Sequence, residues 1–244
     1  MRSADRRLAR VFPLALLWPA VVAAALVLSG CATPTAPTVR VVGSLLSPLW
    51  TGSPQAAAFA ARLNPALTYL YLAEDGHAPV FLALGYIEPS QPSTLVWYSA
   101  AQEVLRTQGG RLVGLTEQSA SSARLRFDQG IPVWPTATAG PTTYTRSWDF
   151  PNRYRFGLPD QVQLHPRGWQ QVPPALLRHV RSQLQSSAYA QWQWFEETST
   201  LMPPAWFAVA ALAGQQQVVY SYQCLSAERC FHLAPWPLAL TPLP

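Results

Sequence analysis

The sequence contains no lysine, and all 17 of its basic residues are arginine. Only 12% of its 244 residues are charged, about half of the roughly 25% that is usual. Hydrophobic residues make up 49%, so the chain can bury a core, and this composition excludes disorder over most of its length. At ~100–200 residues per domain, the length predicts one domain or at most two.

Positive charge is concentrated at the N-terminus. The whole chain has a formal charge of +5, but four of its arginines lie within the first ten residues. Beyond residue 30, thirteen arginines stand against eleven acids. A nucleic-acid-binding protein presents a basic face that neutralises many phosphates, and so few scattered arginines do not form one. The composition therefore excludes nucleic acid as a partner.

The first thirty residues are typical of an export signal. The arginine-rich start is followed by an uncharged stretch of 18 residues, from Val11 to Leu28. As a helix this stretch is just long enough to cross a bilayer, so a retained membrane anchor is the alternative. Pro13 and Pro19 inside the stretch, and small residues at its end, favour a lipoprotein signal peptide over residues 1–30.

Cys31 follows this segment and ends the sequence Leu28-Ser29-Gly30-Cys31. The sequence resembles the lipobox of bacterial lipoproteins, in which the cysteine thiol receives a diacylglycerol and becomes the first residue after cleavage. The resemblance implies three acyl chains at Cys31, and two or more chains hold a protein stably on a membrane. Residue 32 is Ala32 and not aspartate, which by the same resemblance favours the outer membrane, with the protein facing the periplasm.

The remaining chain divides into a tether and one domain. Residues 32–38 combine proline, threonine and alanine without apolar periodicity, so the segment 31–38 is the lipidated cysteine with an extended tether. Residues 39–244 then form a single β-rich periplasmic domain. In it, capping and proline signals predict one helix over Ser53–Leu63 and a second over Ala175–Leu184.

Most of this domain is typical of short strands at hairpin spacing. Turn signals such as Asp75-Gly76 and Gly109-Gly110 separate runs in which apolar and polar residues alternate. About ten such strands occur without a βαβ rhythm, so we expect a mainly β fold: an antiparallel curved sheet, open barrel-like or a sandwich, with one or two short helices. The expected strands are 68–73, 80–87, 94–99, 103–107, 111–115, 124–128, 143–150, 153–158, 161–165, 190–196, 218–224 and 230–233.

Two cysteines lie on the two arms of one predicted hairpin. Cys224 ends a strand with alternating residues, and Cys230 begins the next one after a short polar loop. In an oxidising periplasm this arrangement predicts a disulfide. A metal site at Cys224, Cys230 and His232 would need a fourth ligand, and no Cys-x-x-Cys pair is present. We therefore expect neither a metal nor another cofactor.

Motifs of catalysis are absent from the sequence. It has no Gly-x-Ser-x-Gly, no P-loop and no His-Glu-x-x-His, and its histidines, 77, 165, 179 and 232, are isolated and expected at the surface or at caps. Glu196 and Glu197 are neighbours in a predicted strand, so they face opposite sides and cannot flank one glycosidic bond. We expect that the protein is not an enzyme. A hydrolase stays the alternative because two acids far apart in sequence can still meet; the acids to test are Asp128, Asp149, Asp160 and Glu196.

Aromatic residues are the remaining signal. Nine tryptophans follow the signal peptide, and such side chains suit sugar faces as well as a core. Arg146 is unusual because alternation places it between Tyr144 and Trp148 on the apolar face of a strand. It either stacks on an aromatic ring and pairs with a buried acid, or it points into a polar groove.

Several short motifs occur in a particular order along the domain. They are Trp97-Tyr98-Ser99, the hairpin sequence from Gln108-Gly109-Gly110 to Val113, the run Tyr144 to Asp149, and Ser221-Tyr222-Gln223. Together they resemble the group 4 capsule polysaccharide lipoproteins, the YjbF/GfcB family, over most of the chain from 67 to 242. The cysteine pair, the Trp/Gln-rich section 169–217 and the lack of lysine depart from that family.

The resemblance implies an outer-membrane lipoprotein that assists exopolysaccharide or capsule assembly or secretion, by binding glycan or an export partner. It makes Arg111, Arg146, Trp148, Asp149 and Trp97 the candidate binding residues. For Arg111 the favoured interpretation is hairpin register and a satisfied buried ion pair. The alternatives to this function are a periplasmic glycan-processing hydrolase and a structural or lipid-handling module, since a curved sheet can enclose an apolar ligand.

Overall fold

The computed structural model describes residues 62–117, 123–136, 139–184 and 186–238. The signal peptide, Cys31, the tether and nearly all of the helix predicted over Ser53–Leu63 lie outside the described residues. No helix within the described ranges combines the length and apolar character that a membrane span requires.

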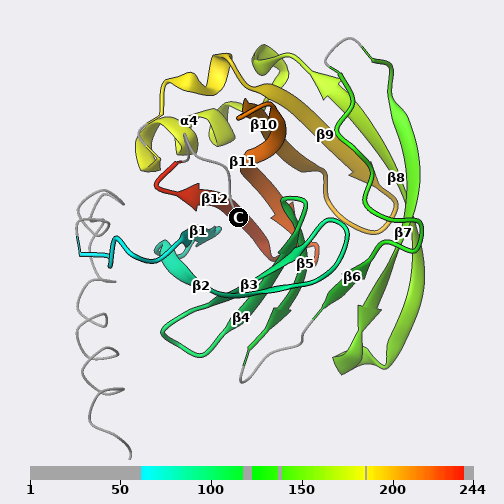
Figure 1. Cartoon of the computed structure of the whole chain (residues 1–244). Helices are drawn as coiled ribbons and strands as arrows, with labels where there is room; N and C mark the ends of the chain where they lie inside the picture. Colours follow the sequence, from blue (N-terminus) through cyan, green and yellow to red (C-terminus); the bar gives the residue numbers. More distant parts are fainter. Residues whose placement is uncertain (1–61, 118–122, 137–138, 185, 239–244) are drawn as a thin grey trace, which may run out of the picture. The chain divides into compact units, whose positions relative to one another are not determined.

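Twelve antiparallel strands form a ring in which each strand pairs with its neighbours in sequence and β1 pairs with β12 (Figure 1). The ring is not a regular barrel, because β5 and β6 meet at a single pair of positions, Gly114 and Arg124. The strands are β1 (Tyr69–Glu74), β2 (Val80–Glu88), β3 (Thr94–Tyr98), β4 (Val104–Gln108), β5 (Arg111–Thr116), β6 (Arg124–Arg126), β7 (Thr142–Phe150), β8 (Arg155–Arg167), β9 (Gln193–Ser199), β10 (Ala205–Leu212), β11 (Gln215–Cys224) and β12 (Cys230–Trp236).

The expected mainly β, antiparallel fold is confirmed, with two corrections to the strands. The segments 153–158 and 161–165 belong to one strand, β8. β10 was not expected, because its sequence is apolar without alternation. The reason is that both of its faces are buried, one in the ring and the other under a helix, so polar residues do not mark an outer face.

Three prolines lie inside strands where the strand has a partner on one side only. At Pro159, β8 pairs with β7, and its pairing with β9 begins only at Val162. At Pro166 it pairs with β9, after its pairing with β7 has ended at Leu164. Pro235 of β12 likewise pairs with β1, after the pairing of β12 with β11 has ended at Leu233. Since proline has no N–H to donate, these one-sided positions allow the strands to continue through it.

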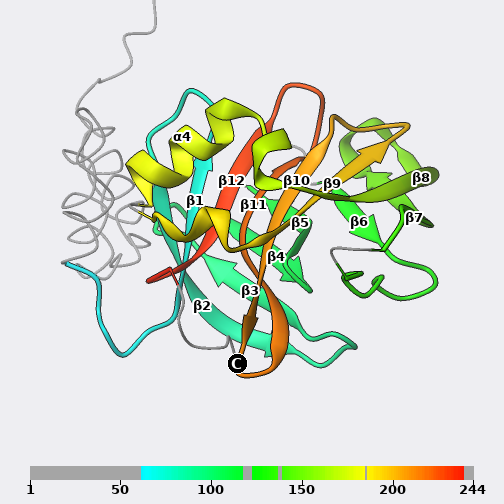
Figure 2. The same cartoon turned by 90° about the horizontal axis from the view of Figure 1, so that it is seen from above.

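One helix, α4 (Pro174–Gln183), covers the outer face of part of the ring, over β1, β10, β11 and β12 (Figure 2). It buries Leu176, Leu177 and Val180 against outward-facing side chains such as Tyr71 and Tyr220. The predicted helix at 175–184 is thus confirmed, with Pro174 at its first position, where no intrahelical N–H bond is lost. Three short 3₁₀ turns, Pro151–Arg153, Trp169–Gln171 and Ala188–Ala190, complete the described helical structure.

Inward-facing side chains fill the ring. They include Trp97, Trp148, Phe195, Phe207 and Phe231, each exposed by 2% or less. The interior of the ring therefore holds a core of packed side chains.

Candidate functional site

A chain of four charged side chains lies buried in the ring. Arg146 of β7 donates through Nε to Oδ2 of Asp160 at 2.8 Å and through Nη1 to Oε2 of Glu197 at 3.3 Å. Arg111 of β5 donates through Nε to Oε1 of Glu197 at 2.9 Å. Two cations and two anions alternate, so the four charges balance within the core, as buried charges must.

Asp160 accepts more hydrogen bonds than Arg146 alone supplies. The indole N–H of Trp148 donates to its Oδ2 at 3.0 Å, and the hydroxyls of Ser199 and Thr200 donate to it at 2.9 and 3.1 Å. Burial acts to raise the pKa of Asp160, but the hydrogen bonds and the charge of Arg146 outweigh burial and hold that pKa below its usual range. The carboxyl therefore stays ionised and does not serve as a proton donor near neutral pH.

Arg111 lies among aromatic rings. Its guanidinium carbon is 4.0 Å from the ring centre of Trp134 and 5.5 Å from that of Phe207. Its Nη1 is buried with no hydrogen-bond partner in the described part of the chain. The ring faces offer that nitrogen an electrostatic partner in place of a hydrogen bond. The interpretation of Arg111 as a buried ion pair agrees with these contacts.

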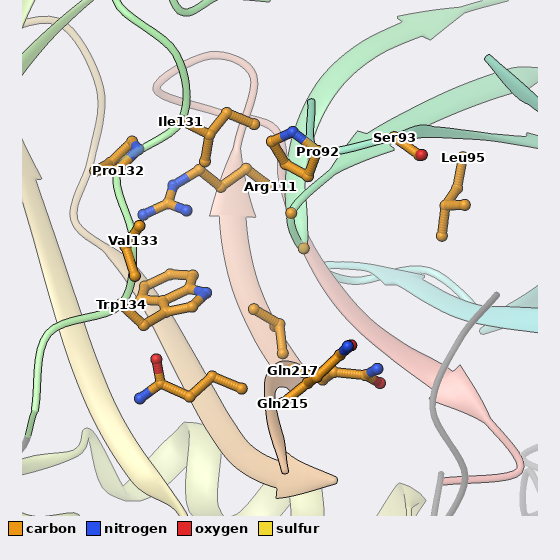
Figure 3. Close-up of a pocket in the computed structure, with 14 residues that line it drawn as sticks. Pro92, Ser93, Leu95, Arg111, Ile131, Pro132, Val133, Trp134, Gln215 and Gln217 are labelled. Atoms are coloured by element: carbon orange, nitrogen blue, oxygen red, sulfur yellow. The ribbon is translucent and has the colours of Figure 1, made fainter. Parts of the chain in front are cut away.

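Arg111 also borders a cavity of about 580 Å³ at one end of the ring, here called the end cavity. Figure 3 shows its guanidinium directed toward Trp134, with Ile131, Pro132 and Val133 alongside. The cavity wall is mostly apolar, and Gln215 to Gln217 at the start of β11 also line it. Arg111 itself is only 1% exposed, so it supports the wall of the cavity and does not present its charge there.

The other candidate binding residues are not brought together at a surface. Trp97 and Trp148 are sealed in the core, where Trp97 donates to Thr107 and Trp148 donates to Asp160. Arg146 is 6% exposed, so of its two interpretations the structure shows the one with a buried acid and an aromatic ring, Trp148, 5.4 Å away. Asp149 lies apart and accepts the N–H of Gly157 in the β7–β8 hairpin.

The acids considered for a hydrolase take up different places. Asp160 is sealed in the core with Glu197, whereas Glu196 on the opposite face of β9 pairs with Arg167 at 2.7 Å. The opposite facing of Glu196 and Glu197, predicted from their adjacency, is confirmed. Asp149 lies 3.5 Å from Arg126, and Asp128 is exposed in the loop after β6. The two acids that meet do so inside the core, around Arg146.

A groove of about 590 Å³, here called the polar groove, crosses β7, β8 and β9. Its lining side chains are uncharged, and most carry an amide or a hydroxyl. Strand register places Thr143 opposite Gln163 and Gln163 opposite Thr198, with Thr145 opposite Gln161 in the next row. These five residues alternate with inward-facing ones, so their side chains face away from the core. Within the described residues, no hydrogen bond joins these five side chains to another protein group.

A cluster of histidine and tyrosine side chains was not expected from the sequence. The rings of His179 on α4 and His232 on β12 stack with their centres 3.6 Å apart. Tyr71 lies 3.1 Å from Nε2 of His179, and His232 bonds to Tyr220 at 2.7 Å and to Asp75 at 3.2 Å. The expectation that both histidines lie at the surface or at caps is wrong for His232, which is 7% exposed. They are 53 positions apart in sequence, so no local pattern could have paired them.

Burial sets the charge of this cluster. It lowers the pKa of His179 to about 3, and the nearby charge of His232 adds to the effect. Burial also lowers the pKa of His232, against the opposing charge of Asp75. Both rings are therefore neutral near neutral pH, which is the state in which they can stack without repulsion.

Cys224 and Cys230 form the predicted disulfide across the β11–β12 hairpin. Within the described residues, no group of three or more histidine, cysteine, aspartate or glutamate side chains is arranged to hold a metal ion.

These observations define an antiparallel β-ring domain with a sealed ionic centre and with cavities at its surface. No family model matches the chain, and no curated protein matches it. Among solved structures, the hypothetical lipoprotein YmcC from Escherichia coli K12 is similar, with 17% sequence identity and a TM-score of 0.49, over 84% of this chain and 96% of that one. The resemblance to the capsule lipoproteins stays a prediction from the sequence.

Proposed function

We propose that this chain is a lipid-anchored accessory protein of exopolysaccharide or capsule assembly or secretion, which binds glycan at the polar groove without catalysing a reaction. Its anchor is Cys31 in the lipobox-like sequence, and Ala32 favours the outer membrane, with the domain facing the periplasm. Acyl chains at Cys31 would hold the domain beside the membrane through which the polysaccharide leaves.

The observation that supports the proposal most directly is the chemistry of the polar groove. Sugar hydroxyls both donate and accept hydrogen bonds, and amide and hydroxyl side chains match both roles. The rows Thr143–Gln163–Thr198 and Thr145–Gln161 offer such groups side by side on adjacent strands. Because the groups carry no charge, covering them costs less than covering ions, provided that the ligand replaces their bonds to water.

The state of the acids supports binding without catalysis. Glycoside cleavage requires two carboxyl groups on either side of the bond in an open cleft. The two acids that meet, Asp160 and Glu197, are held by Arg146 in the core. The polar groove has no acidic residue among its lining side chains.

The test combines binding with secretion. Polysaccharide purified from the producing strain is titrated into the full chain in detergent, and Gln163→Ala and Gln161→Ala are each expected to weaken binding by about tenfold. Gln191→Ala, an exposed amide outside the groove, is the matched control and keeps the original affinity.

The same variants then replace the gene in the producing strain. Loss of secreted polysaccharide in the deletion strain and in Gln163→Ala, with normal yield for Gln191→Ala, is the expected result. Normal yield and composition in the deletion strain under all growth conditions would overturn the proposal. Loss in the deletion strain together with full function of both groove variants would point to an export partner instead of glycan.

Lipid handling is the second candidate, and the end cavity favours it. Its wall is formed largely by apolar side chains such as Leu95, Ile131 and Val218. A lipid found by mass spectrometry in the purified protein, and lost on Val218→Gln, would favour this function over glycan binding.

A further inference from the structure

A third cavity, of about 450 Å³, is lined mainly by residues of β4, β5 and β6, at the place where β5 and β6 pair at a single pair of positions. We name it the arginine hollow. Three arginines and one glutamate line it, namely Arg106, Arg124, Arg126 and Glu88. This excess of positive charge contrasts with the uncharged polar groove and with the balanced charges of the core.

Strand register explains how two of these arginines face each other. Arg106 of β4 and Arg124 of β6 are both direct partners of Gly114 on the strand between them. Cross-strand partners share one face of a sheet, and neighbouring strands lie ~4.8 Å apart, so the two arginines rise about 10 Å apart on the same face. The glycine between them has no side chain, and a Cβ built there would meet its nearest neighbours, Ala123 O and Arg106 Cβ, only at 3.8 and 4.0 Å. A side chain at Gly114 would therefore fit without overlap and would enter the hollow that Arg106 and Arg124 line.

The charges in the hollow are only weakly compensated. Arg106 is 3.5 Å from Glu88, and Arg126 is 3.5 Å from Asp149, whereas the buried pairs of the core reach 2.8 Å. Arg124 has no carboxylate within ion-pair distance among the described residues. The connection from β5 to β6, residues 117–123, contains one charged residue, Glu117, and this carboxylate pairs with Arg229 at 2.8 Å. Positive charge without a firm partner, in a concave site, favours an anionic ligand.

Two exposed tyrosine rings continue this surface. Tyr86 and Tyr98 are 45% and 41% exposed, with ring centres 6.4 Å apart. The hydroxyl of Tyr86 donates to Glu88 at 3.1 Å, and Glu88 in turn contacts Arg106, so Tyr86 lies next to the hollow and Tyr98 lies beyond it. Tyr98 packs on Gly85, where any Cβ would overlap its ring, and this contact fixes the ring on the outer face of β2 and β3.

We propose that the arginine hollow binds a carboxylate carried by a sugar, so that the chain recognises an acidic polysaccharide. Arg106 and Arg124 bind the carboxylate from two sides over Gly114, since guanidinium groups match carboxylate oxygens in geometry and charge. Neighbouring sugar rings lie against Tyr86 and Tyr98, whose faces suit apolar C–H surfaces. These rings favour a sugar over a phospholipid headgroup as the carrier of the charge. The inference rests on the proposed function in that its ligand is a glycan, but it concerns a different surface.

The test uses a probe with one variable charge. Oligogalacturonate and its fully methyl-esterified form are titrated calorimetrically into the full chain in detergent at about 0.15 M salt. The acid form is expected to bind about tenfold more tightly than the ester. This ratio of affinities, here called the preference for the acid, should decrease as the salt concentration is raised. Arg124→Gln is expected to remove the preference. Arg178→Gln, at an exposed position of α4, is the matched control that retains it.

A second variant separates binding from folding. Gly114→Val keeps all three arginines, suits a strand and fills the space between Arg106 and Arg124, so it is expected to remove the preference with an unchanged circular dichroism spectrum. Equal affinity for acid and ester, no binding of the acid at millimolar concentration, or a preference that survives both variants would each overturn the inference. Binding to anionic phospholipid vesicles without binding of the acid sugar would overturn it as well.

The outcome is separable from the proposed function. If the ester binds, Gln163→Ala abolishes that binding, and the acid binds no more tightly than the ester, then the polar groove is supported as the glycan site and the inference about the arginine hollow is wrong. If binding of the acid depends on Arg124 and Gln163→Ala does not change it, then the arginine hollow is supported as a binding site and the polar groove is not.

Discussion

Arg146 and Asp160 are direct partners across β7 and β8, and Nε of Arg146 lies 2.8 Å from Oδ2 of Asp160 inside the core. The pair is not isolated, because Glu197 from β9 reaches the same guanidinium and extends to Arg111 on β5. Ion pairs thereby connect three regions of the ring that are far apart in sequence: β5, the β7–β8 hairpin and β9. The cost of burying these ions is offset only while each has its partners.

Glu197→Gln should therefore destabilise the protein far more than Glu196→Gln. The first change leaves Arg111 and Arg146 underpaired in the core, at a cost of about 3–5 kcal/mol in the free energy of unfolding. The second removes a partly exposed partner of Arg167, worth about 0–1 kcal/mol. Urea unfolding followed by tryptophan fluorescence measures both. Equal losses for the two neighbours would show that the buried chain of charges is not what holds these strands.

The sequence predicted part of this centre, and the reason for the limit is physical. Alternation along 143–150 placed Arg146 on the apolar face and required a buried acid or an open groove. It did not say which acid, because Glu197 is 51 positions away and reaches Arg146 only once β9 pairs with β8. The candidate residues Trp97 and Trp148 were on inward-facing positions, and one sequence does not tell whether such a face is filled or hollow.

The strand order was more predictable than the surface sites. Hairpin turns at Asp75-Gly76 and Gly109-Gly110 connect strands as expected, because these residues adopt the required turn conformations readily. The arginine hollow was not predicted, since it depends on Arg106 and Arg124 meeting over Gly114 through pairing of three strands. The polar groove likewise arises from residues of three strands in register.

Stability should fall as the pH is lowered from about 6.5 toward 3, owing to the stacked histidines. The unfolded chain protonates His179 below its ordinary pKa of 6.5, whereas the folded chain, with a pKa of about 3, does not. The unfolded state therefore binds more protons in this window, and each such proton lowers the free energy of unfolding by about 1.4 kcal/mol per pH unit. His232, whose pKa is also lowered, acts in the same direction.

His179→Gln keeps an acceptor near Tyr71 and should flatten this slope between pH 6 and 4 by about one proton. Urea midpoints at several pH values provide the measurement. His77→Gln, at an exposed loop position, leaves the stack intact and should retain the slope of the original protein. A slope that His179→Gln does not change would mean that other groups carry the proton uptake.

Below pH 4 a second loss should appear, from Asp160. Its pKa is held below the ordinary value, so the stability that it contributes is present above about pH 4 and disappears as the pH falls through the folded value. Asp160→Asn removes this acid-dependent part but also costs stability at neutral pH, because Arg146 loses a partner. Thermal unfolding at pH 7 and pH 3 distinguishes the two effects: the difference between the two pH values should be smaller in Asp160→Asn.

Reduction of the Cys224–Cys230 bond should have a modest effect. The two cysteines are six positions apart, and closing so short a loop stabilises a protein by about 2 kcal/mol in the chain-entropy description. Cys224→Ala with Cys230→Ala should therefore lower the free energy of unfolding by about that amount while the fold persists. Intact-mass measurement before and after alkylation verifies the bond in the original protein, and a protein that fails to fold without it would contradict the prediction.

Cys31→Ser should keep the protein out of the outer membrane, because a serine hydroxyl cannot take the diacylglycerol that the lipobox-like sequence predicts at this position. A single acyl chain already binds membranes only marginally, so a chain with none has no lipid hold at this position. When cells are fractionated, the variant should be missing from the outer-membrane fraction. Its intact mass should show that residues 1–30 are still attached. Ala32→Asp is the companion change: it keeps Cys31 and lipidation but should shift the protein toward the inner membrane. An unmodified thiol in the original protein would remove the basis for the anchor, and with it the reason for placing glycan binding beside the membrane.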